Sequence, residues 1–288
     1  MTQTQPIGVF DSGIGGLTVI RALRERLPAE DILYFGDAAR VPYGGKSAET
    51  VLRFTRECLG FLVRRDVKLL VVACNTASAL ALPVLAGSLP MPAIGVIEPG
   101  VKAAMSRTRN RRIGVIGTEG TVGSSAYRKA LEQGVEAMPG ASAASGPARG
   151  ALRVFEQACP LFVPLAEEGW TEGEVPRLAA QRYLAPLLAH EIDTLILGCT
   201  HYPLLRGVIA EVAGPSVALV DSGAETACMT QARLEALGLA RRGPERGRCT
   251  VFVTDRPQRF REIGTAFLGE PLESVEVVDQ SDLPWYER

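Results

Sequence analysis

Histidine is scarce in this sequence, and the cysteines are scattered along it. Two histidines and six cysteines occur in 288 residues, and no two cysteines form a CxxC pair. Zinc sites need clustered ligands and disulfide frameworks need paired thiols, so this spacing argues against both. We expect reduced thiols and no metal site. The cysteines are Cys58, Cys74, Cys159, Cys199, Cys228 and Cys249.

Long apolar runs and an excess of one charge are also missing. The stretch ASALALPVLAGSLP is interrupted by Pro83 and is too short to span a bilayer. The first residues lack the basic and apolar regions of a signal peptide. Lys and Arg number 31 against 32 Asp and Glu, so no basic excess indicates nucleic acid or an anionic membrane as a partner. We expect a cytoplasmic protein that acts on a small molecule.

What the sequence does contain is a series of short apolar runs, each followed by a segment with helical periodicity. Such alternation is typical of βα units, whose strands form a mostly parallel sheet. The fold class that we predict is therefore α/β. The runs, in chain order, are IGVF, DILYFG, LLVVA, AIGVI, RIGVIG, TLILG, VALVD and TVFVT.

Two pairs of segments resemble each other at a spacing of about 105 to 125 residues, which indicates two similar lobes. LLVVACNTASALALPVL resembles TLILGCTHYPLLRGVI, and IGVFDSGIGGLTVIRAL resembles IGVIGTEGTVGSSAYRKAL. Pro99 and Gly100 are expected to interrupt regular structure at one crossing, and VDSGAE marks the other. We predict one lobe from residues 1–98 plus 222–288 and another from 99–221. The Ala- and Gly-rich segment 139–151 is expected to be a mobile loop.

Two cysteines stand where ligand sites form in parallel α/β sheets, namely after a strand and before a helix. Cys74 and Cys199 both follow apolar runs, and a helix N-terminus there can activate a thiol and hold an anion. A single cysteine in this position is most often a small buried apolar residue. The duplication favours a catalytic pair instead. We interpret the other four cysteines as structural.

Two further residues neighbour these strand ends. His201 is either a buried or capping histidine or, two residues from Cys199, a proton partner of that thiol. Asp11 in VFDSGIGG is either ordinary turn and cap chemistry or an acid–base residue. The glycines around it do not form GxGxxG, which argues against a dinucleotide-binding loop.

The segment ARVPYGGKS is either a plain turn or a ligand-binding loop, and the residues alone leave both interpretations open. In the second case Gly44 would let backbone amides approach a ligand, and Tyr43 would line its pocket. We expect N-cap or surface roles for three further polar residues: Thr118, Thr121 and Glu167.

Two thiols on opposite lobes suit the inversion of a carbon centre. One thiolate removes a proton, and the other thiol donates one from the far side. The carbanion that forms needs preorganised donors aimed at a neighbouring carboxylate. Short donors occur at the appropriate loops: Ser12, Asn75, Thr76 and Thr200.

At these motifs the chain resembles the glutamate racemases, a family of cofactor-independent amino-acid racemases. The resemblance rests on seven blocks in order: VFDSGIGGLTV, YFGDAARVPYGGKS, VVACNTASA, IGVIGTEGTV, CPLFVPLAEEG, LILGCTHYPLL and VDSGAETA. It implies that Cys74 and Cys199 are the two bases and that Asp11 and His201 assist them. It also implies a set of residues around the substrate: Asp11, Ser12, Tyr43, Gly44, Asn75, Thr76, Thr200 and His201.

The resemblance carries further expectations about fold and role. It implies two α/β lobes with the active site in the cleft between them, no pyridoxal phosphate or metal, a homodimer, and D-glutamate made for peptidoglycan. The segment 139–151 is longer than the resemblance leads us to expect, which leaves the place of Glu167 open. Relatives that act on aspartate, hydantoins or malonates are rivals, but the presence of both CNT and CTH favours glutamate. A two-lobed binding protein without chemistry would leave the duplicated thiols unexplained.

Overall fold

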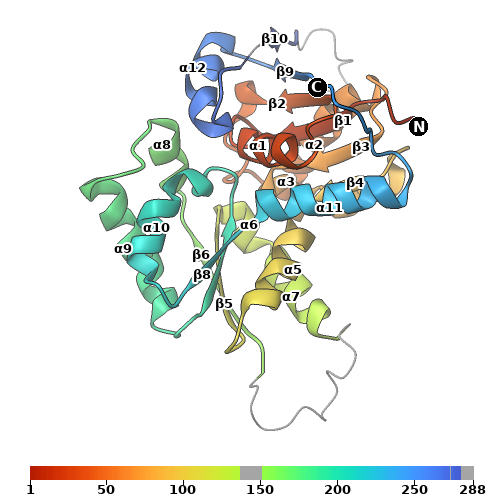
Figure 1. Cartoon of the computed structure of the whole chain (residues 1–288). Coiled ribbons are helices and arrows are strands. Elements are labelled where there is room, and N and C mark those ends of the chain that lie inside the picture. Colours follow the sequence, from red (N-terminus) through yellow and green to blue (C-terminus); the bar gives the residue numbers. More distant parts are fainter. Residues whose placement is uncertain (137–150, 273, 280–288) are drawn as a thin grey trace. The chain divides into compact units, whose positions relative to one another are not determined.

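A computed structural model describes residues 1–136, 151–272 and 274–279 of the chain. The chain divides into two compact units (Figure 1). Unit 1 consists of Met1–Val96 and Gly223–Arg288, and unit 2 consists of Ile97–Ser222. The expected mobile loop at 139–151 lies outside the described residues, apart from its last residue.

Unit 1 is built on a six-stranded sheet in which every neighbouring pair is parallel. Its strands are β1 (Ile7–Asp11), β2 (Ile32–Gly36), β3 (Leu69–Val72), β4 (Ala93–Gly95), β9 (Cys249–Val253) and β10 (Val275–Val277). Their order is β10-β9-β2-β1-β3-β4. Every residue of β1 and β3 is buried, as expected of inner strands covered on both faces.

The register of the inner strands brings the first candidate residues to one edge of this sheet. Phe10 of β1 pairs with Val72 of β3, and the amide of Ala73 donates to the Phe10 carbonyl at 2.8 Å. Asp11 and Cys74 are the next residues of the two segments. They therefore lie at the carboxyl ends of neighbouring strands, where ligands bind in such sheets.

The helices of unit 1 follow its strands and cover the sheet. They are α1 (Leu17–Arg26), α2 (Ala48–Val63), α3 (Asn75–Leu80), α4 (Leu82–Leu85), α11 (Ser222–Ala236) and α12 (Pro257–Leu268), with 3₁₀ turns η1 (Ala38–Arg40) and η2 (Ala86–Ser88). Ser47 caps α2 by accepting from the amide of Thr50, and the buried face of this helix packs on β1 and β2. Helices α1 and α12 pack against each other.

Unit 2 repeats part of this plan with a four-stranded parallel sheet. Its strands are β5 (Arg112–Gly117), β6 (Arg153–Ala158), β7 (Thr194–Gly198) and β8 (Ala218–Asp221). The strands lie in the order β6-β5-β7-β8, so the second strand along the chain comes first, followed by the first, third and fourth. Unit 1 has the same arrangement in its strands β2-β1-β3-β4. The similarity of the two lobes that the repeated motifs predicted is therefore present in the sheet topology.

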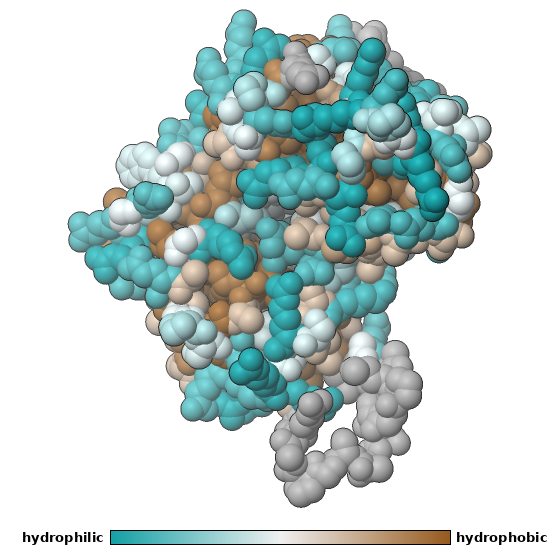
Figure 2. Space-filling view, in the orientation of Figure 1, coloured by the Kyte–Doolittle hydropathy of each residue, from teal (hydrophilic) through white to brown (hydrophobic). Residues whose placement is uncertain are grey.

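Helices flank the sheet of unit 2. They are α5 (Ile97–Arg107), α6 (Glu119–Gly123), α7 (Ala126–Glu136), α8 (Phe162–Glu167), α9 (Glu174–Leu188) and α10 (Arg206–Ala213), with the 3₁₀ turn η3 (Tyr202–Leu205). Helices α5 and α7 pack together, as do α9 and α10 on the other side of the sheet (Figure 1). Figure 2 shows hydrophobic residues at the surface over α9 and α10, among hydrophilic ones.

One local expectation was wrong. Pro99 and Gly100 do not interrupt regular structure, because both lie in the first turn of α5. A proline is tolerated there, since its missing N–H would have no partner inside the helix. Gly100 provides room for a neighbour, because a Cβ at this position would lie 3.3 Å from Cε1 of Tyr127.

Within the described residues, none of the helices combines the length and the apolar character that crossing a bilayer requires.

Candidate active site

Asp11 and Ser12 lie where β1 ends and the glycine-rich loop before α1 begins. The Asp11 side chain is fully buried, and its Oδ2 accepts a hydrogen bond from the amide of Gly13 at 2.9 Å. An acidic side chain that accepts from the second residue after it forms the turn expected of Asp-Ser-Gly. The turn fixes the carboxylate at the carboxyl edge of the sheet.

The loop after Asp11 is held closely against β2. The hydroxyl of Tyr34 donates to the Gly13 carbonyl at 2.7 Å. Burial, together with Asp11 and Cys74 nearby, raises the pKa of Tyr34 well above its ordinary value, so this donor keeps its proton. Gly16 is required for the close approach, because a Cβ there would lie 2.5 Å from the Cβ of Asp11.

Cys74 occupies the N-cap position of α3 and is 5% exposed. Its thiol donates to Oγ of Ser12 at 3.3 Å, and its sulfur accepts from the amide of Ala77 at 3.5 Å. A cap usually uses an oxygen of Ser, Thr, Asp or Asn, so a sulfur in this place is unusual. The N–H donor can stabilise negative charge on the sulfur, and Ser12 can receive a proton from it or return one.

Asn75 and Thr76 are the first two residues of α3, and both side chains are almost completely buried. They follow Cys74 at the same edge of the sheet as Asp11. We call Asp11, Ser12, Cys74, Asn75 and Thr76 the Cys74 cluster.

Tyr43 and Gly44 belong to the segment between η1 and α2. The Tyr43 side chain is buried in the core of unit 1, and its hydroxyl donates to Oδ2 of Asp37 at 2.5 Å. Burial, Cys58 and Asp37 raise its pKa well above the ordinary value. The Tyr43 ring thus anchors the segment, and Gly44 next to it is half-buried. The hydroxyl of Tyr43 is thus engaged by Asp37 within unit 1.

Asp37 is the residue of unit 1 that sequence reasoning missed. Its carboxylate is fully buried and receives three side-chain donors, from Tyr43, from Arg40 at 2.7 Å and from Thr254 at 3.0 Å. Arg40 also pairs with Glu57 of α2. The sequence offered one indication of Asp37, namely its place directly after β2 in the block YFGDAARVPYGGKS. An acidic side chain that is buried at such a place needs several hydrogen-bond donors around it.

Cys199 follows β7 as Cys74 follows β3, and it is 6% exposed. Its Sγ lies 3.8 Å from Nδ1 of His201, which is within hydrogen-bonding range for sulfur. The other ring nitrogen, Nε2, lies 3.0 Å from Oε1 of Glu167 at the end of α8. Cys199, His201 and Glu167 therefore form a continuous chain of proton-carrying groups.

The electrostatics of this chain keep the imidazole protonated. Burial lowers the pKa of His201, but hydrogen bonds to Cys199 and Glu167, with their charges, outweigh it and raise the pKa to about 10. At neutral pH both ring nitrogens then carry protons, one directed at the sulfur and one at the carboxylate. Thr200, between the two residues, is 7% exposed. We call Glu167, Cys199, Thr200 and His201 the Cys199 cluster.

Of the three residues expected to be caps or surface residues, only Thr118 has such a place. Thr121 lies within α6 and its side chain is buried, so the expectation was wrong for this residue. Thr118 caps α6 by accepting from the amide of Thr121 at 3.2 Å, as the cap interpretation predicted. Glu167 has a different place from the one expected, because it pairs with His201. Glu167 and His201 are 34 residues apart in the sequence, so no local pattern indicates their contact. The only indication of a role for Glu167 was its place in the block CPLFVPLAEEG.

The remaining cysteines take no part in these clusters. Cys58 and Cys159 are buried, and burial raises the pKa of both thiols. Cys249 is buried within β9, whereas Cys228 is exposed on α11. Among the described residues, no three histidine, cysteine or acidic side chains group as metal ligands would.

Comparison with known proteins places the chain in a family. A model of the family described as Asp/Glu/Hydantoin racemase matches residues 7–230. The glutamate racemase of Geobacter metallireducens is 52% identical over 269 residues, which cover 93% of this chain and 94% of that protein.

Solved structures agree with the sequence comparison. A glutamate racemase from Thermus thermophilus, in complex with β-chloro-D-alanine, is 46% identical, and the match covers 98% of this chain and 100% of that one with a TM-score of 0.84. A glutamate racemase from Francisella tularensis, in complex with D-glutamate, is 36% identical, with coverage of 96% and 98% and a TM-score of 0.85. The chain belongs to the Asp/Glu/Hydantoin racemase family and, within it, to the glutamate racemases.

Proposed function

We propose that this protein interconverts L- and D-glutamate by proton transfer between the substrate α-carbon and two cysteines, Cys74 and Cys199. The observation that carries the proposal is the equivalence of the two thiols. Each is buried and follows the third strand along the chain of its unit, at the carboxyl end of a parallel sheet. Family membership and the D-glutamate complex of the Francisella relative support glutamate as the substrate.

The reaction needs one sulfur as thiolate and the other as thiol. The thiolate removes the α-proton and becomes a thiol, while the second thiol donates its proton to the opposite face of the carbanion and becomes a thiolate. The product is the mirror image of the substrate, and the enzyme is left in the protonation state that accepts that product. No electron leaves the system, so the chemistry requires no redox group.

Neighbouring groups adjust the protonation of each sulfur. On the Cys199 side, His201 carries the proton that balances a negative sulfur, and Glu167 holds the imidazole in place. On the Cys74 side, Ser12 accepts from the thiol, with the buried Asp11 carboxylate in the same cluster. General acid–base groups of this kind are typically worth about 10²–10⁴ in rate.

The substrate has two carboxylates and an ammonium group, which must be held while the carbanion forms. We assign this task to short donors of the two clusters and to the segment of Tyr43 and Gly44. Preorganised donors at the carboxylate stabilise the charge that develops as the proton leaves. The assigned donors are Ser12, Asn75, Thr76 and Thr200, with Asp11 and His201 beside them.

A direct assay tests the proposed activity. Purified protein is dialysed against a chelator and incubated with L-glutamate and no added cofactor, and both enantiomers are followed by chiral chromatography. We expect conversion to an equal mixture of enantiomers. Unchanged L-glutamate would refute the activity. Activity that returned only after a divalent ion or pyridoxal phosphate was added would refute cofactor independence. Faster turnover of L-aspartate than of L-glutamate would assign the protein to a different substrate.

Isotope incorporation tests the use of two bases. When L-glutamate reacts in D₂O, the α-proton leaves to one sulfur and deuterium arrives from the other, which has exchanged with solvent. Early product should therefore carry α-deuterium while the remaining L-glutamate stays protonated, and D-glutamate should give the mirror result. Comparable label in both enantiomers at an early time would indicate one base for both faces.

We further propose a biological setting from the family resemblance. The protein would act in the cytoplasm as a homodimer and supply D-glutamate for peptidoglycan, and its two lobes would be residues 1–98 plus 222–288 and 99–221. Exposed apolar side chains in or beside α8 and α9 offer a surface for association: Leu161, Trp170, Val175 and Leu178. Light scattering gives the mass in solution, and a monomer at micromolar concentration would refute the dimer.

A further inference from the structure

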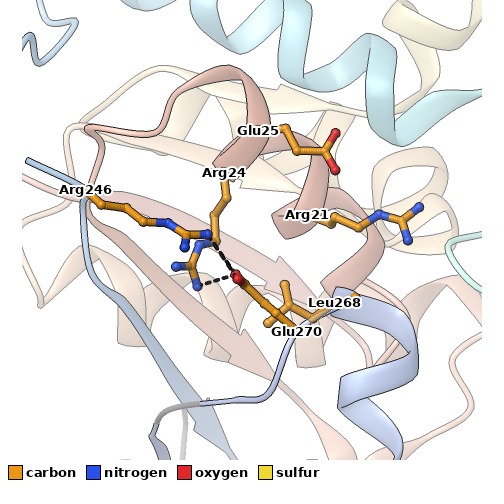
Figure 3. A pocket seen from close by; sticks show the side chains of 7 residues that line it. Arg21, Arg24, Glu25, Arg246, Leu268 and Glu270 are labelled. Atoms are coloured by element: carbon orange, nitrogen blue, oxygen red, sulfur yellow. Dashed lines mark hydrogen bonds and ion pairs between the residues drawn. The ribbon is translucent and has the colours of Figure 1, made fainter. Parts of the chain in front are cut away.

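A hollow of about 190 Å³ lies in unit 1, at the C-terminal ends of α1 and α12 (Figure 3). None of the residues that line it belongs to the Cys74 cluster. Three arginines and two glutamates supply its charged groups, and Leu268 and Gly269 complete the lining. Figure 3 shows the side chains of two of these arginines converging on Glu270.

Two guanidinium groups of the hollow already hold a carboxylate. Nη1 of Arg24 lies 3.0 Å from Oε1 of Glu270, and the Arg24 side chain is only 11% exposed. Nη2 of Arg246 lies 3.0 Å and 3.1 Å from the two oxygens of the same carboxylate. The planar guanidinium fork matches the geometry of carboxylate and phosphate groups. Arg24 and Arg246 thus form a binding site for an oxyanion, and the carboxylate of Glu270 occupies it.

The third arginine of the hollow has no such partner. Arg21 is exposed and makes no hydrogen bond or ion pair with the part of the chain that the structure describes. The residue opposite it is Gly269, whose φ of +84° closes α12 in the left-handed region. A Cβ at Gly269 would lie 3.3 Å from Cδ and 3.8 Å from Nη1 of Arg21. The missing side chain therefore leaves the Arg21 guanidinium uncovered on the side of the hollow.

The charge of the lining sets the kind of ligand. Three arginines against Glu25 and Glu270 leave one positive charge in excess. A second anionic group can be bound by Arg21 directly, or by Arg24 and Arg246 after it displaces Glu270. Larger polyanions are disfavoured by the two carboxylates and by the small volume.

We propose that this hollow is a binding site for a small metabolite bearing a carboxylate or phosphate group, with Arg21 as the free contact and Glu270 as an internal competitor. The site is separate from the cysteine clusters. It rests on the geometry of unit 1 alone, so its failure would leave the proposed racemase activity untouched.

Side-chain NMR of the full-length protein tests the site. The Nε–Hε signals of the three arginines, assigned from single Arg→Lys variants, are followed while inorganic phosphate or, separately, acetate replaces chloride at constant ionic strength. We expect saturable shifts of the signals of Arg21, Arg24 and Arg246. The two titrations show whether phosphate or carboxylate is preferred. Shifts that rise linearly without saturation for both anions would overturn the proposal.

Two variants are expected to change the affinity for the anion in opposite directions. Arg21→Ala should weaken binding by about fivefold or more, because it removes the uncovered guanidinium. Glu270→Gln should tighten binding by a similar factor, because the internal competitor loses its charge. Both variants should keep racemase activity and a wild-type thermal transition, which shows that the fold is intact.

Matched controls separate a site from a general charge effect. Arg261→Ala and Glu262→Gln make the same changes on exposed residues of α12 outside the hollow. Both controls should leave the affinity unchanged. Equal effects of Glu262→Gln and Glu270→Gln, or of Arg261→Ala and Arg21→Ala, would show that the protein's overall charge attracts the anion, and the assigned site would be wrong.

Discussion

In unit 1 the thiol of Cys74 contacts a hydroxyl and a backbone amide, whereas in unit 2 the thiol of Cys199 lies beside a protonated imidazole that is paired with a carboxylate. The two sulfurs follow equivalent strands of sheets with the same strand order. The repeated topology therefore places the two thiols at equivalent positions, but the residues that contact each thiol differ between the units. Ser12 comes from the loop after β1, and Glu167 comes from α8.

The difference indicates a division of labour that suits a reversible proton transfer. His201 places a protonated imidazolium beside Cys199, because the pKa of His201 is raised to about 10. The thiol of Cys74 contacts two neutral groups, the Ser12 hydroxyl and the Ala77 amide, and we expect its proton to exchange through Ser12. The following variants test this comparison, in order of decreasing expected effect.

The largest effect should come from removing either sulfur. Cys74→Ala and Cys199→Ala should each reduce kcat/KM for racemisation by roughly 10³-fold or more, since each removes a general acid–base group. The double variant should be scarcely slower than either single one, because the two thiols act as one unit. A single variant with near wild-type turnover would contradict the equivalence of the two cysteines. Cys228→Ala, on the exposed face of α11, is the control and should be neutral.

A large effect on stability is expected in unit 1 alone. Lys68 is fully buried, and its Nζ donates to Glu30 at 2.5 Å, to the Gln3 carbonyl at 2.8 Å and to the Leu239 carbonyl at 2.9 Å. Lys68→Met should lower the free energy of unfolding by about 3–5 kcal/mol, because it leaves Glu30 buried without its cation.

Urea unfolding measures this loss, and hydrogen exchange should locate it in unit 1. The exposed pair of Lys102 and Glu98 in α5 provides the control, since Lys102→Met should change the unfolding free energy by less than about 1 kcal/mol. If Lys68→Met changed stability no more than Lys102→Met, the buried pair would not hold the two chain segments of unit 1 together.

A smaller effect on rate, with a characteristic pH dependence, is expected at Glu167. Glu167→Gln removes a carboxylate that raises the pKa of His201, so this pKa should fall from about 10. The imidazolium is present below its pKa and is lost above it. The alkaline decline of kcat/KM should therefore begin at lower pH in the variant, with a loss on the order of tenfold at neutral pH.

The loss should be equal in both directions, because the equilibrium constant of racemisation is one. Glu172→Gln, an exposed residue of the same unit, makes the same change of charge and should leave the pH profile in place. An unshifted alkaline limb in Glu167→Gln would mean that the Cys199 cluster does not work through His201.

The smallest effect is expected at Ser12. Ser12→Ala removes the acceptor of the Cys74 thiol, and a hydrogen bond of this kind is worth about 1 kcal/mol, or roughly fivefold in kcat/KM. Ser88→Ala removes a hydroxyl that donates to the Leu85 carbonyl elsewhere in unit 1 and is the matched control. If Ser12→Ala were as harmless as the control, Cys74 would need another route for its proton.

Much of the fold follows from the sequence because the inner strands are buried on both faces. All eight apolar runs became strands, since a strand between two layers of helices needs apolar residues at nearly every position. Strands β6 and β10 were missed. Both are edge strands with partly exposed residues, and RVFEQA and VEV contain no apolar run.

The candidate site was predictable only in part, for a related reason. Residues next to strand ends, such as Cys74 and His201, carry a local signal because the strand itself can be recognised. The contact of His201 with Glu167 depends on how α8 packs, which no local pattern reports. The direction of the Tyr43 side chain was equally hidden, because it depends on the buried Asp37.

The interruption of unit 1 by unit 2 has a consequence for synthesis on the ribosome. Strand β9 pairs with β2 inside the sheet of unit 1, yet it is translated after the whole of unit 2. Until it emerges, β2 presents an open strand edge, which is a site for pairing with other chains. Unit 2 has all four of its strands by then and can fold first. The nascent chain is therefore most vulnerable to aggregation at β2 during the seconds that separate the two parts of unit 1.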